Sequence, residues 1–268
     1  MPAEASPLAV LQEGDPRRKA AAARAFRSAV LDGPIVETGT PPDDPARPDK
    51  PELVSARDLP RRRLGSVEGR AALLHAIAHI ELNAIDLAAD MVARFDDCPE
   101  IDGVEDDFWR DWSSVCDDEA RHFVMVADRL EDLGFPYGSF PAHGGLWDAA
   151  RRTSDDIAAR LAIAPLVLEA RGLDVTPGMI VKLDQAGDTQ SADILRVIYR
   201  EEVGHVAIGM KWLRHVAESR GTDPKALFRG MVLAYHPGMV RPPFNHDART
   251  KAGLDLTYYD DLAAAGAN

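Results

Sequence analysis

Cysteine is scarce in this sequence, with only Cys98 and Cys116 among 268 residues. Two cysteines cannot build the multiple-disulfide framework of a small secreted domain, and they are too few to ligate an iron–sulfur cluster. The sequence also has no rubredoxin-like segment with four cysteines. Any redox chemistry must therefore use other ligands, and we expect its electrons to come from a separate donor.

Long hydrophobic runs are also missing. No stretch reaches the ~18 uninterrupted apolar residues that indicate a transmembrane helix. The N-terminal residues MPAEASPLAVLQEGDPRRK lack the basic start and apolar core of a secretory signal. We therefore expect a cytoplasmic protein without a membrane partner.

Positive charge is in short supply. The sequence has 31 Lys and Arg against 44 Asp and Glu, which gives a net charge of −13. A broad nucleic-acid-binding surface requires an excess of basic residues, so this charge disfavours nucleic acid as a partner.

Residues that favour α-helix are abundant, and the apolar residues recur at helical spacing. This pattern predicts an all-α fold. Four long helices are expected over residues 66–95, 105–133, 146–171 (or from 154) and 188–220, with additional helices over about 16–32 and 224–235. Helix three should bend at Pro165 and end near Gly172, before a short helix that reaches Gln185.

The segment between residues 34 and 63 contains seven prolines. Such a segment should be extended, because proline fixes φ and disfavours helix in the residue before it. It either wraps over the helices or is a disordered linker. We expect three regions: residues 1–64 with this segment, a bundle over 65–221, and a C-terminal helix and tail over 222–268.

A pattern of glutamate and histidine recurs along the four long helices. Helices one and three each carry a lone glutamate, and helices two and four each carry Glu-x-x-His. The residues are Glu81, Glu119, His122, Glu169, Glu202 and His205. Three residues turn an α-helix by about 300° and rise about 4.5 Å, so both members of each pair lie on one face. This is the ligand pattern of a di-iron or di-manganese four-helix bundle of the ferritin-like type.

All six residues lie on the apolar stripes that should face the core. A lone ionised carboxylate there would cost several kcal/mol. Two divalent metals carry four positive charges and would balance four glutamates with neutral imidazoles. The alternative is a buried polar network in which Arg121 and Arg171 neutralise the glutamates, but it leaves both histidines unexplained.

Carboxylate oxygen and imidazole nitrogen suit iron or manganese, and no thiolate is present to favour zinc or copper(I). We expect two iron ions, with Mn/Fe or Mn/Mn as alternatives. Asp118 and Glu201 each precede a ligand glutamate and are candidates to orient the ligand histidines, or else are surface acids. Tyr199 lies one turn before Glu202 and is a candidate neighbour of the site, or else a packed tyrosine.

Several runs resemble known families. Asp118–His122 resembles the Asp-Glu-x-Arg-His motif of the bacterial multicomponent mono-oxygenases, and Glu201–His205 is similar to the second motif of rubrerythrin-like proteins. More of the chain resembles a bacterial ferritin-like family known as domain of unknown function 455. The runs that carry this likeness are GRAALLHAIAHIELNAIDLAAD, DDEARHF, LEARGLDVTP, EEVGHVAIGMKWL and RPPFNHDARTKAG. The resemblance implies a fold and a metal site but no substrate.

These features favour an O₂-dependent oxidoreductase of the hydroxylase or oxidase type, acting on an unknown small or macromolecular substrate. Ferroxidase, iron storage or detoxification without an organic substrate is the alternative, and manganese catalase-like peroxide chemistry is another. About 60 residues precede the bundle and about 45 follow it, which favours a covered pocket over a compact cage-forming ferritin.

Overall fold

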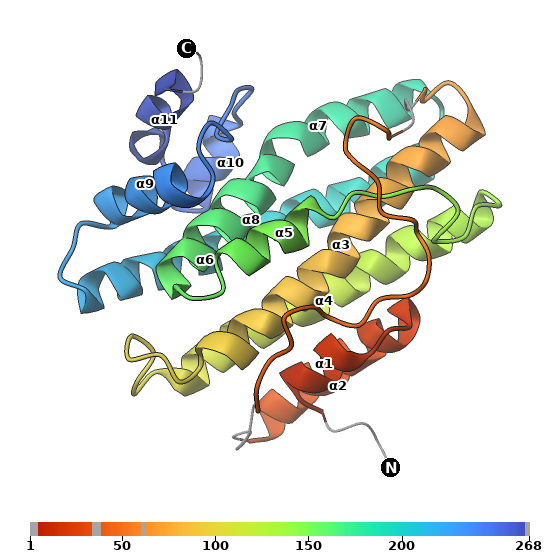
Figure 1. The fold of residues 1–268 in the computed structure, drawn as a ribbon. Coiled ribbons are helices and arrows are strands. Elements are labelled where there is room, and N and C mark those ends of the chain that lie inside the picture. The colour runs from red at the N-terminus through yellow and green to blue at the C-terminus, as the bar shows by residue number, and fades with distance from the viewer. Residues whose placement is uncertain (1–4, 34–38, 60–62, 266–268) are drawn as a thin grey trace. The chain divides into compact units, whose positions relative to one another are not determined.

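The computed structural model describes residues 5–33, 39–59 and 63–265. All the elements named within these residues are helices, joined by irregular segments (Figure 1). In order they are α1 (Pro7–Gln12), α2 (Pro16–Asp32), α3 (Val67–Phe95), α4 (Glu105–Asp132), α5 (Gly145–Arg152), α6 (Ile157–Ile163), the π-helix η1 (Ala164–Glu169), α7 (Ala170–Gln185), α8 (Thr189–Ser219), α9 (Pro224–Tyr235), α10 (His246–Lys251), the 3₁₀-helix η2 (Leu256–Tyr258) and α11 (Asp260–Ala265). The all-α class predicted from the sequence is confirmed.

The chain forms two compact units. The first contains Met1–Asp96, Gly103–Trp147 and Ile180–Ile194, and the second contains Asp97–Asp102, Asp148–Met179 and Leu195–Asn268. The long helices α7 and α8 each contribute residues to both units. The division at residues 64 and 221 expected from the sequence stays a prediction.

In the first unit α3 packs against α4, while α2 packs on α4 and α1 on α3. The helix α3 begins at the N-cap Ser66, whose side chain accepts a hydrogen bond from the Gly69 N–H at 3.1 Å. It is apolar enough for a membrane span by length and composition, but 89% of its most apolar window is buried inside the protein. A helix buried to this extent belongs to the core of its unit.

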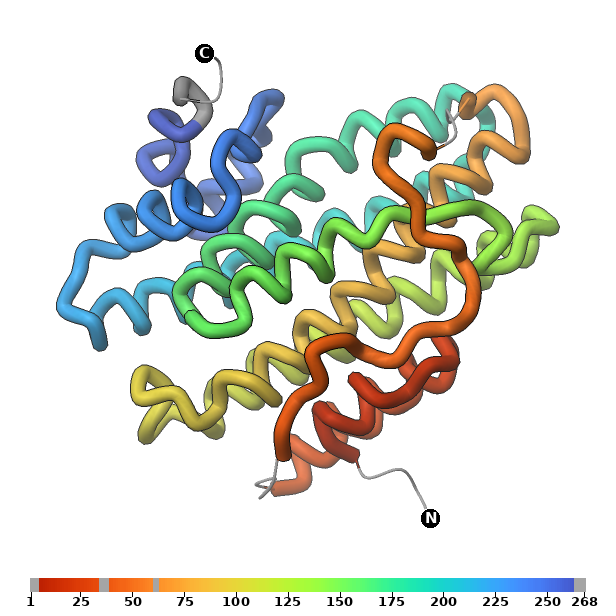
Figure 2. The backbone as a smooth tube through the Cα atoms, viewed as in Figure 1, coloured from red at the N-terminus to blue at the C-terminus, as the bar shows by residue number. Residues whose placement is uncertain are grey.

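The described part of the proline-rich segment, residues 39–59, forms no helix and follows a winding course with several bends and a turn at 56–58 (Figure 2). The Arg47 guanidinium donates to Asn83 Oδ1 at 2.8 Å, and Arg94 donates to the Pro42 carbonyl at 2.9 Å. These two contacts tie the first half of the segment to α3, while Glu52 and Val54 exchange backbone hydrogen bonds with Ala142 in the loop after α4. Residues 34–38 and 60–62 of the predicted segment lie outside the described residues.

A buried ion pair joins the N-terminal helices to α3. Lys19 on α2 and Asp86 on α3 are both inaccessible to solvent. The Lys19 ammonium donates to Asp86 Oδ1 and to the Val10 carbonyl, and Arg47 lies 3.2 Å from the other Asp86 oxygen. Burial outweighs these cations and raises the pKa of Asp86. The Asp86 carboxylate therefore depends on its partners to remain charged.

We expect Lys19→Met to lower the free energy of unfolding by about 3–5 kcal/mol, because it leaves the buried Asp86 short of a counter-charge. Urea denaturation followed by circular dichroism measures the change. The double variant Lys19→Met/Asp86→Leu removes both charges and should recover most of the loss. Equal destabilisation in the single and double variants would show that the pair matters through packing and not through charge.

In the second unit the predicted break of helix three after Gly172 is wrong, because α7 continues through Pro177 to Gln185. Proline has no N–H to donate to the carbonyl four residues before it, which here belongs to Leu173. That carbonyl accepts instead from Asn245 Nδ2 at 3.2 Å. A side chain distant in sequence thus replaces the missing hydrogen bond, and the helix persists.

Candidate metal centre

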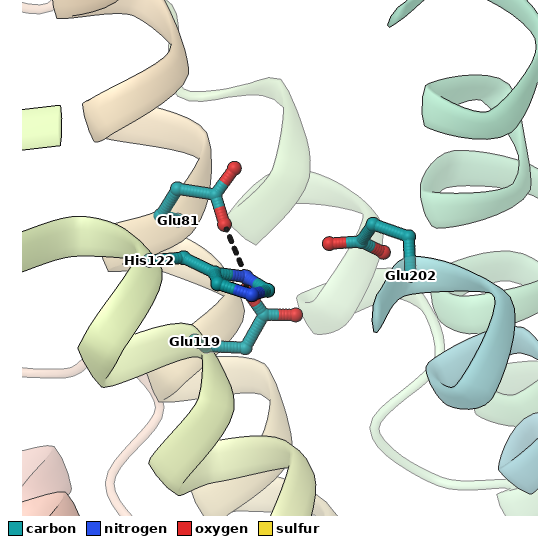
Figure 3. A group of neighbouring side chains, drawn as sticks. All are labelled: Glu81, Glu119, His122 and Glu202. Atoms are coloured by element: carbon teal, nitrogen blue, oxygen red, sulfur yellow. Dashed lines mark ion pairs between the residues drawn. The ribbon is translucent and has the colours of Figure 1, made fainter. Parts of the chain in front are cut away.

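In the first unit three predicted ligands converge from two neighbouring helices. Glu81 comes from α3, and Glu119 and His122 come from α4; all three are at least 95% buried. His122 Nδ1 lies 3.3 Å from Glu81 Oε2 and 3.5 Å from Glu119 Oε2 (Figure 3). Each residue offers one ligand atom within 4.8 Å of the others. This spacing suits a shared cation.

The two carboxylates dominate the electrostatics of His122. Burial alone would lower the pKa of this imidazole, but Glu119 and Glu81 outweigh burial and raise the pKa to about 11. Without a metal, a proton on His122 thus supplies the positive charge that the two glutamates require. A metal ion bound by the same atoms would take over this role and displace the proton.

In the second unit α8 carries the other predicted pair. Glu202 and His205 lie one turn apart, with His205 Nδ1 3.6 Å from Glu202 Oε2, and both side chains are buried. The fourth glutamate, Glu169, is half-buried and is the last residue of the π-helix η1. The group of neighbouring side chains in Figure 3 includes Glu202 together with Glu81, Glu119 and His122. It is a buried cluster of glutamate and histidine that suggests a metal site.

The sequence matches the family described as "protein of unknown function (DUF455)" over residues 12–260. This chain belongs to the DUF455 family. The likeness to this family noted in the sequence is thereby confirmed, while its ferritin-like character stays a prediction. An uncharacterized protein of Haemophilus influenzae is 43% identical to this DUF455 protein over 210 residues, which are 78% of this chain and 73% of the relative. No solved structure matches the chain.

The three additional candidates from the sequence have contacts of their own. In this DUF455 protein Asp118 accepts a hydrogen bond from Arg121 Nη2 at 2.6 Å, and both side chains are about one third exposed. The Tyr199 hydroxyl accepts from Asn245 Nδ2 at 2.8 Å. Glu201 is half-buried on α8. Their roles beside the metal site stay predictions.

The structure also shows a tyrosine–histidine pair that the sequence does not predict. Tyr137, in the loop after α4, packs its ring edge-on against Phe123, the residue after His122, with 5.4 Å between ring centroids. Its hydroxyl lies 2.8 Å from His79 Nδ1, and burial lowers the pKa of His79 to about 4. No periodic signal marks a loop residue, so only the folded chain reveals this pair.

Proposed function

We propose that this protein is a non-haem di-iron carboxylate oxidoreductase of the ferritin-like type, with Mn/Fe as an alternative metal pair, which uses O₂ to oxidise a substrate not yet identified. The observation that carries the proposal is the convergence of Glu81, Glu119 and His122 in a buried core, in one group with Glu202. Buried carboxylates in such number require cations. The ferritin-like four-helix bundle is part of this proposal.

The proposed ligand set is the full set of six. Glu81, Glu119, Glu169 and Glu202 would hold two metals through their carboxylate oxygens, and His122 and His205 would each supply a nitrogen. The donor chemistry fits this assignment, because carboxylate oxygens and imidazoles with no thiolate suit iron and manganese. Four carboxylates also match the charge of two divalent ions.

A bound metal pair would supply the electrons that reduce O₂, and the protein would supply ligation and exclusion of water. The burial of Glu81, Glu119 and His122 supports this role, since water has little access to their ligand atoms. Electrons for repeated turnover would come from a separate donor. We propose a cytoplasmic location, which the burial of α3 supports.

We expect the metal-free protein to bind two Mn²⁺ ions per chain, as a dinuclear carboxylate bundle does. Glu202→Gln should weaken the binding of both, because it replaces a ligand carboxylate by a neutral amide and lowers the negative charge that balances the two ions. Glu218→Gln is the matched control, since Glu218 lies exposed on the same helix. Electron paramagnetic resonance of free Mn²⁺ measures the titration. If Glu202→Gln binds Mn²⁺ with wild-type affinity and stoichiometry, then α8 contributes no ligand. That result would contradict the dinuclear proposal.

A further inference from the structure

A wide helical turn holds Glu169. The π-helix Ala164–Glu169 separates α6 from α7, and the backbone N–H of Ala170 donates to the carbonyl of Pro165, five residues earlier. A π-turn contains one more residue than an α-turn, so it rotates every later side chain by about 100° relative to an uninterrupted α-helix. The direction in which Glu169 leaves its helix therefore depends on this turn.

Pro165 provides the reason for the wide turn. It lies at the start of the π-helix, where it has no N–H to give to the carbonyl of Leu161. Its ring would also clash with that carbonyl in regular α-helix. A π-turn, which holds one more residue than an α-turn, avoids both the missing hydrogen bond and the clash. The segment stays helical.

Gly209 on α8 lies directly against this proline. A Cβ at residue 209 would lie 2.7 Å from Pro165 Cβ, 2.8 Å from Pro165 Cγ and 3.3 Å from Leu166 Cδ2. Carbon atoms in favourable contact are about 3.5–4.0 Å apart, so even an alanine would push the two segments away from each other. Gly209 follows His205 by four residues and Glu202 by seven, on the same face of α8. The contact therefore joins the face that carries these two residues to the turn that carries Glu169.

We propose that Pro165 and Gly209 are positioning residues, which together fix the direction and distance of Glu169 relative to Glu202 and His205. This inference rests on the proposed metal site. Pro165 selects the π-turn, and Gly209 allows α8 to approach it. Neither residue touches the metal; each acts through the placement of a ligand carboxylate.

The test compares two identical substitutions on α8. Gly209→Ala should weaken Mn²⁺ binding by about tenfold to a hundredfold, the range usual for groups that orient metal ligands, and should resemble Glu169→Gln. Gly204→Ala is the matched control, because a Cβ at residue 204 meets no atom within 4 Å. It should bind Mn²⁺ as wild type does and melt at the same or a higher temperature. Equal Mn²⁺ affinity in Gly209→Ala, Gly204→Ala and wild type would overturn the proposal.

A second variant separates positioning from folding. Pro165→Ala restores a backbone N–H and removes the ring, so the wide turn should close toward regular α-helix and Mn²⁺ binding should weaken as it does in Gly209→Ala. A folded Pro165→Ala variant with wild-type Mn²⁺ affinity would contradict the proposal, as would failure of both variants to fold, since the contact would then serve stability. If wild type itself binds no metal, the proposed function fails; if wild type binds two ions and Gly209→Ala is unaffected, only this inference fails.

Discussion

When the anaerobically reduced protein loaded with two ferrous ions meets O₂, we expect rapid uptake that matches the number of metal pairs and then stops. Uptake should resume only after an external reductant is added. The reason lies in the sequence, which has six candidate metal ligands but no cysteine-rich redox segment and no nucleotide-phosphate motif. Stopped-flow oxygen measurement with titrated ferrous iron follows the reaction directly.

An iron store would behave differently in the same experiment. Added ferrous ions would keep O₂ consumption going, and many irons per chain would accumulate as mineral. O₂ uptake that continues far beyond two irons per chain, with the iron retained in the protein, would contradict the oxygenase proposal. It would show that the protein stores iron. Size-exclusion chromatography gives a second comparison, because a 24-subunit shell would favour storage.

The second prediction with a large expected effect concerns substitution of two proposed metal ligands. We expect Glu119→Ala and His205→Ala each to lose at least one of the two metals and yet to retain the helical circular dichroism of wild type. The helices carry long apolar stripes, and in the first unit α3 is buried over most of its length. Such a core folds without metal, unlike a small zinc domain.

Metal analysis and circular dichroism on the same samples measure both expectations. Asp107→Ala is a suitable control, because Asp107 is exposed on α4, the helix of Glu119. It should keep both metals. Loss of helical structure at low temperature in Glu119→Ala or His205→Ala, with Asp107→Ala intact, would show that the metal is chiefly structural.

The features predicted well from the sequence are those that depend on local spacing. The i, i+3 relation of Glu119 and His122 places both side chains on one face of a helix, whatever the rest of the chain does. The apolar residues around Glu81 likewise mark its buried face. In the structure Glu81 is on the buried face of α3 and Glu119 and His122 are on the buried face of α4 for this reason, and the all-α class follows from the same periodicity.

The features missed depend on partners distant in sequence. Proline in the middle of a helix predicts a break, but at Pro177 the Asn245 side chain takes the place of the missing backbone donor. The space that Gly209 leaves for Pro165 likewise concerns residues on two separate helices. A single sequence does not show which side chain reaches which turn, so neither arrangement was predictable from spacing.

The metal content of the protein purified from iron-replete cells tests the central claim most directly. Elemental analysis should find about two metal ions per chain, iron alone or iron with manganese, as a dinuclear carboxylate bundle requires. One zinc per chain, or no bound metal even after anaerobic reconstitution with ferrous iron, would contradict the account.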